Sequence, residues 1–449
     1  MLYPISSKIP TRSNYEHLKR HLKPVKNSII YHRGSERQTR DDTDVELDFR
    51  QESNFFYLSG VEDPGYHILI LTDTDEIYLI PPTIPDKDQL WKGTPESHDL
   101  LIKKYDVNHI LTEQDLPGFL RRLSPSLVYT LPTTDIEQLG LSLERESLEW
   151  ALREARLIKN EWEIVTMRYA AQVSSHAHLS LMSHVAQHRD LEEAELEALF
   201  RYVCAKNGLK RQCYLPIIGS GYNAAVLHYT DNNKKVPSGR HDLVLVDAGG
   251  ERQCYGSDIT RTFPVSGKYS QEAKDIYSIV LETQKSVLAS LKPGVFWTDM
   301  SNLAIRALCE GLLRIGILKG GDVDTLVELG VYRTFYFHGL GHSVGVDCHD
   351  VGGDDIGILS RKGTSLNMLT RPLEENMVIT VEPGLYFNDV SINAWLKDYP
   401  DYLDLDKINQ YRVIGGVRIE DTVLITKEGH ENFTIVPKEI NDIEAIMDA

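Results

Sequence analysis

Short apolar runs separated by polar, helix-like segments dominate the first third of the chain, from about residue 14 to 135. Runs of four to six residues rich in β-branched and aromatic side chains predict strands, and amphipathic segments between them predict helices. The runs interpreted as strands are NSIIYHRG, NFFYLSGV, YHILILT, EIYLIPP and SLVYTLP, and the helix-like segments are HDLLIKKYDV and GFLRRL. The pattern predicts a mixed α/β amino-terminal domain.

Residues 140–205 change to a helical period, with apolar positions three and four residues apart and charges between them. The segments SLERESLEWALREARLIKNEWEIVTMRYAAQVSSHAHLSLMSHVAQ and DLEEAELEALFRYVCAKNG therefore predict long amphipathic helices. We place the domain boundary near residue 155, within ten residues either way, which gives domains at 1–155 and 156–449.

Strand-like runs return after the helices, interrupted by the helix-like KDIYSIVLETQKSVLASL and DMSNLAIRALCEGLLRIG. The simplest architecture for such a pattern is an antiparallel sheet flanked by helices, so the fold class is α+β. The runs are CYLPIIGSG, DLVLVDAGG, CYGSDITRTFPV, MVITVEPGLYF and GVRIEDTVLIT.

Composition narrows the possible partners. The 66 acidic residues outnumber the 48 Lys and Arg, giving a formal net charge of −18, which repels a phosphate backbone and disfavours nucleic acid as a partner.

No segment approaches the ~18 uninterrupted apolar residues of a membrane span, and the amino terminus carries no apolar secretion signal. The five cysteines show no CxxC spacing, which favours neither a disulfide framework nor a thiolate metal site. We expect a cytoplasmic protein.

Two aspartates stand at unusual positions in the strand-like runs. Asp247 ends the apolar run DLVLVD, and Asp258 follows eleven residues later in GSDITRTFPV. Antiparallel pairing of these runs would bring both carboxylates to one point. Either aspartate alone is more simply a turn residue, since Asp before Gly is common turn chemistry.

The same feature recurs twice near the carboxyl terminus. Glu382 lies in MVITVEPGLYF and Glu420 in GVRIEDTVLIT, each an acid within a β-branched run. Burying one unpaired carboxylate is expensive and calls for a cation or a cluster of hydrogen-bond donors. Four such acids in four strands of one predicted sheet are harder to explain as turn residues than one.

The segment FHGLGHSVGVDCHD supplies three histidines, His338, His342 and His349. The four-residue spacing of the first two imitates a helical zinc pair, but Gly339 and Gly341 disfavour a helix. We therefore predict a glycine-rich loop or strand that presents one histidine ligand, although a single histidine is more often a packing residue.

Four carboxylates and one imidazole make an oxygen-rich site suited to manganese, cobalt, magnesium or iron. Two dications would balance the four negative charges at the ~3.5–4 Å separation at which two metals share one water. We predict a two-metal hydrolase in which a bridging hydroxide attacks a carbonyl.

These motifs resemble the pita-bread metallopeptidases, which include prolidase, aminopeptidase P, methionine aminopeptidase and creatinase. The segment FRQESNFFYLSGVEDPG resembles the amino-terminal domain shared by prolidase and aminopeptidase P, which methionine aminopeptidases lack. The segment WKGTPESHDLLIKKYDV resembles prolidase more closely. The later segments VDAGGERQCYGSDITRTFPVSGKYS, FHGLGHSVGVDCHDVGG, TVEPGLYF and GVRIEDTV follow the family's order. The resemblance implies a homodimer with two divalent ions per subunit, which we expect to be manganese.

The resemblance also implies how the ligands divide. Asp247 would bind one metal, His342 and Glu382 the other, and Asp258 and Glu420 would bridge them. Glu382 would also take a proton from the attacking water.

Further residues are expected around the metals. The matching positions give His228 and His349 as histidines that bind substrate and intermediate, and Arg418 and Tyr214 as substrate or supporting contacts. We interpret His338 as a structural support of the metal ligand.

For the substrate, the resemblance implies hydrolysis of the bond between an amino-terminal residue and a following proline, and the first half favours Xaa-Pro dipeptides. Arg371 is the candidate for the substrate carboxylate, but Asn367 and Met368 stand where a dipeptidase would carry a further arginine. Two alternatives remain: an Xaa-Pro aminopeptidase acting on longer peptides, and a non-catalytic binding module with the same fold, which the full ligand set disfavours.

Overall fold

The computed structural model describes residues 8–132, 134, 140–351 and 371–448. The chain folds into two compact units. The first contains the described residues up to Arg156 together with Asn160–Trp162, and the second contains Leu157–Lys159 and the described residues from Glu163 onward.

A six-stranded mixed sheet organises the first unit, with the strand order β4-β3-β2-β1-β5-β6. Antiparallel pairs join β1 to β2 and β2 to β3, whereas β3 and β4, β1 and β5, and β5 and β6 pair in parallel. The strands are β1 (Ser28–Arg33), β2 (His67–Leu71), β3 (Glu76–Ile80), β4 (His109–Ile110), β5 (Leu127–Tyr129) and β6 (Leu143–Glu144). The helices are α1 (Thr11–Leu22), α2 (Ser53–Ser59), α3 (Asp86–Lys92), α4 (His98–Lys104), α5 (Leu116–Leu123) and α6 (Glu146–Leu157). The predicted α/β character of this region is confirmed.

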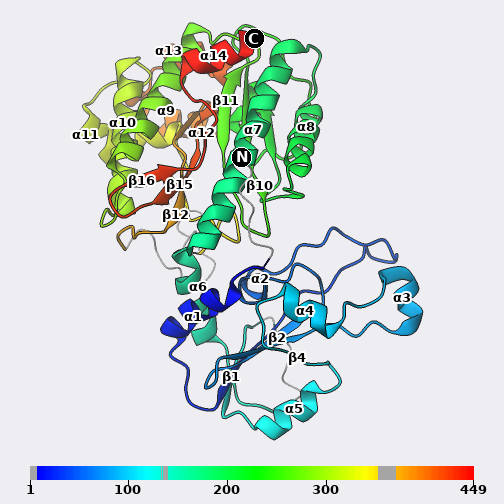
Figure 1. Ribbon diagram of the computed structural model, residues 1–449. Helices are drawn as coiled ribbons and strands as arrows, with labels where there is room; N and C mark the ends of the chain where they lie inside the picture. The colour runs from blue at the N-terminus through cyan, green and yellow to red at the C-terminus, as the bar shows by residue number, and fades with distance from the viewer. Residues whose placement is uncertain (1–7, 133, 135–139, 352–370, 449) are drawn as a thin grey trace. The chain divides into compact units, whose positions relative to one another are not determined.

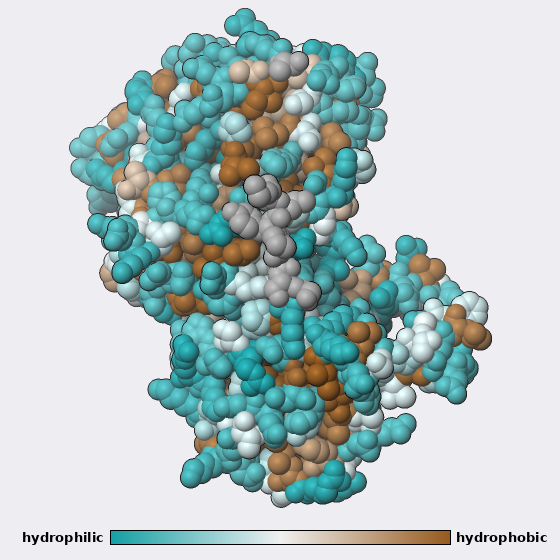
Figure 2. Space-filling model, in the orientation of Figure 1, coloured by the Kyte–Doolittle hydropathy of each residue, from teal (hydrophilic) through white to brown (hydrophobic). Residues whose placement is uncertain are grey.

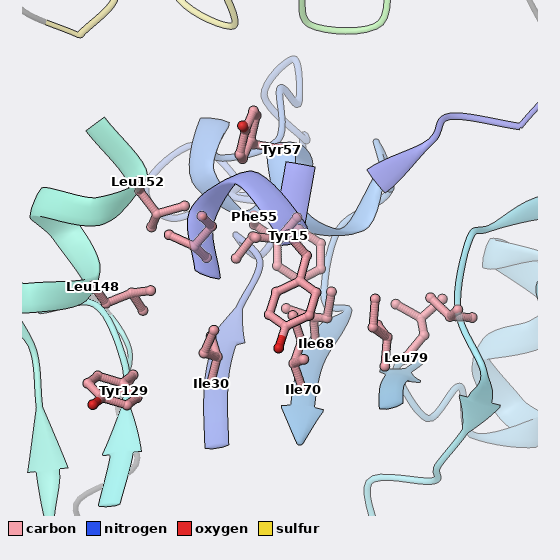
Figure 3. Packing of buried hydrophobic residues seen from close by; sticks show 14 of the residues in the cluster. Tyr15, Ile30, Phe55, Tyr57, Ile68, Ile70, Leu79, Tyr129, Leu148 and Leu152 are labelled. Atoms are coloured by element: carbon pink, nitrogen blue, oxygen red, sulfur yellow. The ribbon is translucent and has the colours of Figure 1, made fainter. Parts of the chain in front are cut away.

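Helices pack on one face of this sheet through a single apolar cluster (Figure 3). Ile30, Ile68 and Ile70 project from the central strands toward Tyr15 of α1 and Phe55 of α2. All five are essentially inaccessible to solvent. Full burial of such side chains contributes roughly 1.5–3 kcal/mol each. A second buried cluster joins Ile29 and Leu69 of the sheet to Leu120 of α5, so both clusters stabilise the unit.

The apolar run NFFYLSGV forms helix α2, and its interpretation as a strand is wrong. The carboxylate of Glu52 caps the helix by accepting hydrogen bonds from the backbone N–H groups of Asn54 and Phe55. At the other end Gly60 takes a left-handed conformation, with φ of 68°, and its N–H donates to the carbonyl of Phe56. The two caps stabilise a short helix that periodicity alone does not distinguish from a strand.

The second unit contains long helices and several short strands. Its strands are β7 (Arg211–Gln212), β8 (Ile217–Ser220), β9 (Leu243–Asp247), β10 (Gly250–Glu251), β11 (Thr260–Pro264), β12 (Val378–Val381), β13 (Gly384–Tyr386), β14 (Gly416–Arg418), β15 (Asp421–Ile425) and β16 (His430–Asn432). Its α-helices are α7 (Glu161–Gln187), α8 (Glu193–Lys206), α9 (Gln271–Ser290), α10 (Trp297–Arg314), α11 (Val323–Leu329), α12 (Asp389–Asp398), α13 (Leu405–Tyr411) and α14 (Ile440–Asp448). Short 3-10 helices are η2 (Gly221–Ala225), η3 (Val331–Thr334), η5 (Pro400–Tyr402) and η6 (Arg412–Ile414).

The strands of this unit pair antiparallel throughout its described part, as expected, but they form several small sheets rather than one. Two three-stranded sheets have the orders β11-β9-β8 and β12-β15-β16, and β13 pairs with β14. Helices α7 and α8 lie on one side of these strands and α9 and α10 on the other (Figure 1). Ile379 of β12 and Val423 of β15 pack in one buried cluster with Val287 of α9 and Ala304 of α10. This packing holds β12 and β15 against the two helices.

Hydrophilic residues cover most of the face shown in Figure 2, as expected from the acidic composition. Among the described residues no helix combines the length and apolar character needed to cross a membrane.

Candidate metal centre

Asp247 and Asp258 come from two neighbouring antiparallel strands. Asp247 is the last residue of β9, and Thr260 of β11 lies opposite it in the register. Asp258 precedes Thr260 by two residues, so it lies just before its strand. The predicted pairing of these two runs is confirmed. Asp247 is held by the Tyr214 hydroxyl, which donates to Oδ1 at 2.6 Å.

Glu382 and Glu420 lie at breaks between strands. Glu382 separates β12 from β13, and Glu420 separates β14 from β15. The expectation of four carboxylates within the strands of one sheet is therefore wrong. The physical reason is that a break relaxes the strict alternation of side-chain faces, so carboxylates from several small sheets can reach one point. A backbone bridge between Thr260 and Glu420 joins two of these segments.

His342 is presented by a non-helical segment that lies along β12, as predicted. Its backbone N–H donates to Thr380 Oγ1 at 2.9 Å, and its ring Nδ1 lies 3.0 Å from the carbonyl oxygen of Ser343. Gly341 is required here, because a Cβ atom at this position would stand 2.2 Å from the carbonyl oxygen of Thr380. The segment thus fixes the imidazole with Nε2 3.3 Å from Asp258 Oδ2.

The five predicted ligands fall into two groups whose ligand atoms lie within 4.8 Å of one another. One group is Asp247, Asp258 and Glu420, and the other is His342, Glu382 and Glu420. Glu420 belongs to both groups. The arrangement can hold two cations side by side, with Glu420 between them.

Electrostatics supports this reading of the site. Burial raises the pKa of Glu420 well above its ordinary value, and the negative charges of Asp258 and Glu382 add to the effect. Burial likewise raises the pKa of Glu382 to about 7 and raises that of Asp247. Four acids in so small a volume fit a pair of hard dications, which would remove the mutual repulsion.

Asp258 behaves differently from its neighbours. Burial would raise its pKa, but hydrogen bonds from His342 and Cys348 outweigh burial and lower it. Only 4% of the residue is exposed, yet its Oδ1 has no hydrogen-bond partner. A buried carboxylate oxygen without a donor is the position at which a metal ion is expected.

A hydrogen-bond network of residues outside the ligand groups holds the ligands in place. The Arg418 guanidinium donates to Asp247 Oδ2 at 2.5 Å and to the Tyr386 hydroxyl at 2.9 Å. His338 Nε2 lies 2.8 Å from the same hydroxyl, and its Nδ1 is 3.8 Å from Glu382 Oε2. Sequence reasoning missed Tyr386, because a tyrosine in an apolar strand reads as a core residue. Its place in TVEPGLYF, four residues after Glu382, was the available signal.

The structure places the other predicted residues differently. His349 is exposed, and its ring centroid is 4.2 Å from that of His342, whose charge, with burial, lowers the His349 pKa to about 4. His228 is exposed in the turn after η2, and its charge lowers the pKa of His349 and His338. Arg371 pairs with Glu374. Asn367 and Met368 lie outside the described residues.

Comparison with known proteins agrees with these features. Residues 165–427 match the model of metallopeptidase family M24, and residues 13–129 match that of the aminopeptidase P amino-terminal domain. A probable Xaa-Pro aminopeptidase of Pyrenophora teres is 39% identical over 94% of this chain and 92% of its own length. A second, of Uncinocarpus reesii, is 37% identical over 93% of this chain and 90% of its own length.

Solved structures show the same likeness. The aminopeptidase PepP of Pseudomonas aeruginosa has a TM-score of 0.82 at 32% identity and covers 99% of both chains. A zinc-substituted Escherichia coli aminopeptidase P in complex with product has a TM-score of 0.82 at 29% identity, over 98% of this chain and 99% of its own. The chain therefore belongs to metallopeptidase family M24, in its pita-bread branch with an aminopeptidase P amino-terminal domain, and is a metal-dependent hydrolase with a dinuclear centre.

Proposed function

We propose that this chain hydrolyses the peptide bond between an amino-terminal residue and a following proline, with two manganese ions held by Asp247, Asp258, His342, Glu382 and Glu420. The observation that carries the proposal is the pair of ligand groups that share Glu420. The relatives named Xaa-Pro aminopeptidase support the choice of bond. Manganese suits a set of four carboxylates and one imidazole.

The two dications, when bound, supply Lewis acidity toward the scissile carbonyl and toward a water molecule. Glu382 takes the proton of the attacking water. A carboxylate can accept this proton, and the side chain of Glu382 is accessible to water, with 14% of it exposed. The exposed His349 and His228 donate hydrogen bonds to the substrate carbonyl, where one such donor is typically worth ~10²–10³ in rate.

The remaining residues position these groups. Arg418 and Tyr214 orient Asp247, to which both donate hydrogen bonds. Because proline has no N–H and a fixed φ, the residues that contact it must select it by shape rather than by accepting a hydrogen bond. Arg371 is the candidate partner for a substrate carboxylate.

The test is hydrolysis of Gly-Pro by chelator-treated protein before and after addition of manganese, with metal content measured in parallel. We expect proline release only in the reloaded protein, together with about two metal ions per chain. Failure to bind any divalent metal, combined with no cleavage, would refute the proposal. It would favour the non-catalytic alternative.

Substrate length is tested by comparing Ala-Pro with Ala-Pro-Ala. Xaa-Pro dipeptides are the substrates we propose, so alanine should be released from the first and not from the second. Release from both would identify an aminopeptidase for longer peptides. The homodimer and the cytoplasmic location stay predictions.

A further inference from the structure

Cys348 lies at the edge of the metal centre, and none of the roles proposed above uses it. Its Sγ donates to Asp258 Oδ2 at 2.9 Å, and His342 Nε2 lies 3.3 Å from the same oxygen. With His349, these residues form a third group in which one ligand atom from each lies within 4.8 Å of all the others. The three residues that surround the thiol are therefore all capable of binding metal.

The chemistry of this third group differs from that of the other two. Each of those contains only carboxylates, or carboxylates with a single imidazole, whereas this one offers one sulfur, two imidazoles and one carboxylate. Thiolate and imidazole select thiophilic ions, and four such ligands suit the tetrahedral coordination of zinc. The group therefore fits zinc or cadmium better than manganese.

The third group shares one vacant acceptor with the dinuclear centre and is open to solvent. The unpartnered Oδ1 of the buried Asp258 can bind an ion of either group, so the two groups compete for this carboxylate. His349 is exposed and Cys348 is half-buried, which gives an ion a path from solvent to the group. The absence of CxxC spacing concealed the site, because its four ligands come from two separate segments of the chain.

We propose that Asp258, His342, Cys348 and His349 form a second binding mode for a thiophilic dication of the zinc or cadmium class. The Cys348 thiol releases its proton to solvent as the bond from sulfur to metal forms. This mode occupies His349, and it takes Asp258 and His342 away from the manganese pair. Its consequence is inhibition of the hydrolase, a statement that rests on the proposed function.

The direct test is titration of chelator-treated, full-length protein with Co²⁺, which gives a near-ultraviolet charge-transfer band when a thiolate binds it. We expect the band in the wild type and in Cys213→Ser, and its loss in both Cys348→Ser and Cys348→Ala. Cys213 is the matched control, because its thiol contacts that of Cys348. No band in the wild type, or a band that survives in both Cys348 variants, would overturn the proposal.

A second measurement tests the consequence. The Cd²⁺ concentration that halves manganese-dependent hydrolysis of Ala-Pro should rise at least about tenfold in Cys348→Ser, because losing even a supporting partner of a ligand costs ~10–100-fold in affinity. Equal sensitivity of wild type and variant would overturn the inhibitory mode. A thiolate band in a protein that never cleaves Ala-Pro would leave this metal site standing and refute the proposed function instead.

Discussion

Glu420 is the residue shared by both ligand groups of the dinuclear centre. In the wild type, Thr260 Oγ1 donates a hydrogen bond to Glu420 Oε2 at 2.6 Å. Glu420→Gln keeps the shape of the side chain and an oxygen that can accept this hydrogen bond. It removes the charge that both cations need. We expect hydrolysis of Ala-Pro to fall at least about 100-fold, beyond the ~10–100-fold typical of a lost supporting partner.

The metal-free Glu420→Gln protein should melt no lower than the metal-free wild type, because the substitution removes one of four mutually repelling acids. Glu439→Gln is the matched control, since Glu439 is exposed and its carboxylate pairs with Lys285 at the surface. It should leave activity unchanged, as surface pairs contribute ~0–1 kcal/mol. Wild-type turnover in Glu420→Gln would refute its place in the centre.

Glu382 carries a pH prediction for the metal-free protein. Its pKa rises from 4.5 to about 7 on folding, so the native state binds the proton more tightly than the unfolded state. The contribution of this residue to stability is therefore present below pH 4.5 and is lost as pH rises toward 7. Melting temperatures measured across this window should fall less steeply in Glu382→Gln than in the wild type. Parallel curves for the two proteins would contradict the prediction.

At the scale of elements, the close approach of the His342 segment to β12 depends on Gly341. In Gly341→Ala the added Cβ would meet the carbonyl oxygen of Thr380 at 2.2 Å, so the segment must move away from the strand. We expect a loss of about 1–3 kcal/mol in the free energy of unfolding and weaker metal binding, because His342 moves with the segment.

Gly118→Ala in α5 is the control for this change. A Cβ there has its nearest neighbour at 3.5 Å, the flexible end of Arg122. Alanine should stabilise the helix by up to about 1 kcal/mol without altering metal affinity. Denaturant unfolding and calorimetric metal titration measure both quantities. Unchanged metal affinity in Gly341→Ala would show that the contact does not position the ligand.

At the scale of the whole molecule, metal removal should affect the two units unequally. All five proposed ligands belong to the second unit, so cations bound there would cross-link Asp247 of β9 and the residues that flank β11, β12 and β15, and none of the strands of the first unit. Binding at metal concentrations 100-fold above the dissociation constant stabilises the native state by about 2.7 kcal/mol per site. Chelation should therefore lower the free energy of unfolding of the second unit by that amount.

Hydrogen exchange resolves the difference. After chelation we expect faster amide exchange in residues 243–264, 338–351 and 378–425, and unchanged exchange in β1, β2 and β3. Manganese should restore protection to the second unit. An equal loss of protection in both units would contradict the assignment of the centre to the second unit alone.

The sequence by itself pointed to metal chemistry. Its acids in β-branched runs and the histidine in a glycine-rich segment predicted the types of ligand, because a buried charge needs a partner wherever the chain places it. The spacing of apolar positions predicted most of the helices and strands, because that spacing follows from local backbone geometry. The run NFFYLSGV was an exception: its apolar pattern predicted a strand, whereas the caps at Glu52 and Gly60 stabilise a helix.

Only the tertiary structure decided which residues meet. Asp258, Glu382 and Glu420 lie at breaks between small sheets, and such breaks depend on how segments far apart in sequence pair. Tyr386 and Cys348 looked like ordinary apolar and loop residues until folding placed the hydroxyl beside Arg418 and the thiol beside Asp258. The residue type sets the chemistry of a side chain, and long-range packing sets which other side chains lie close enough to take part in that chemistry.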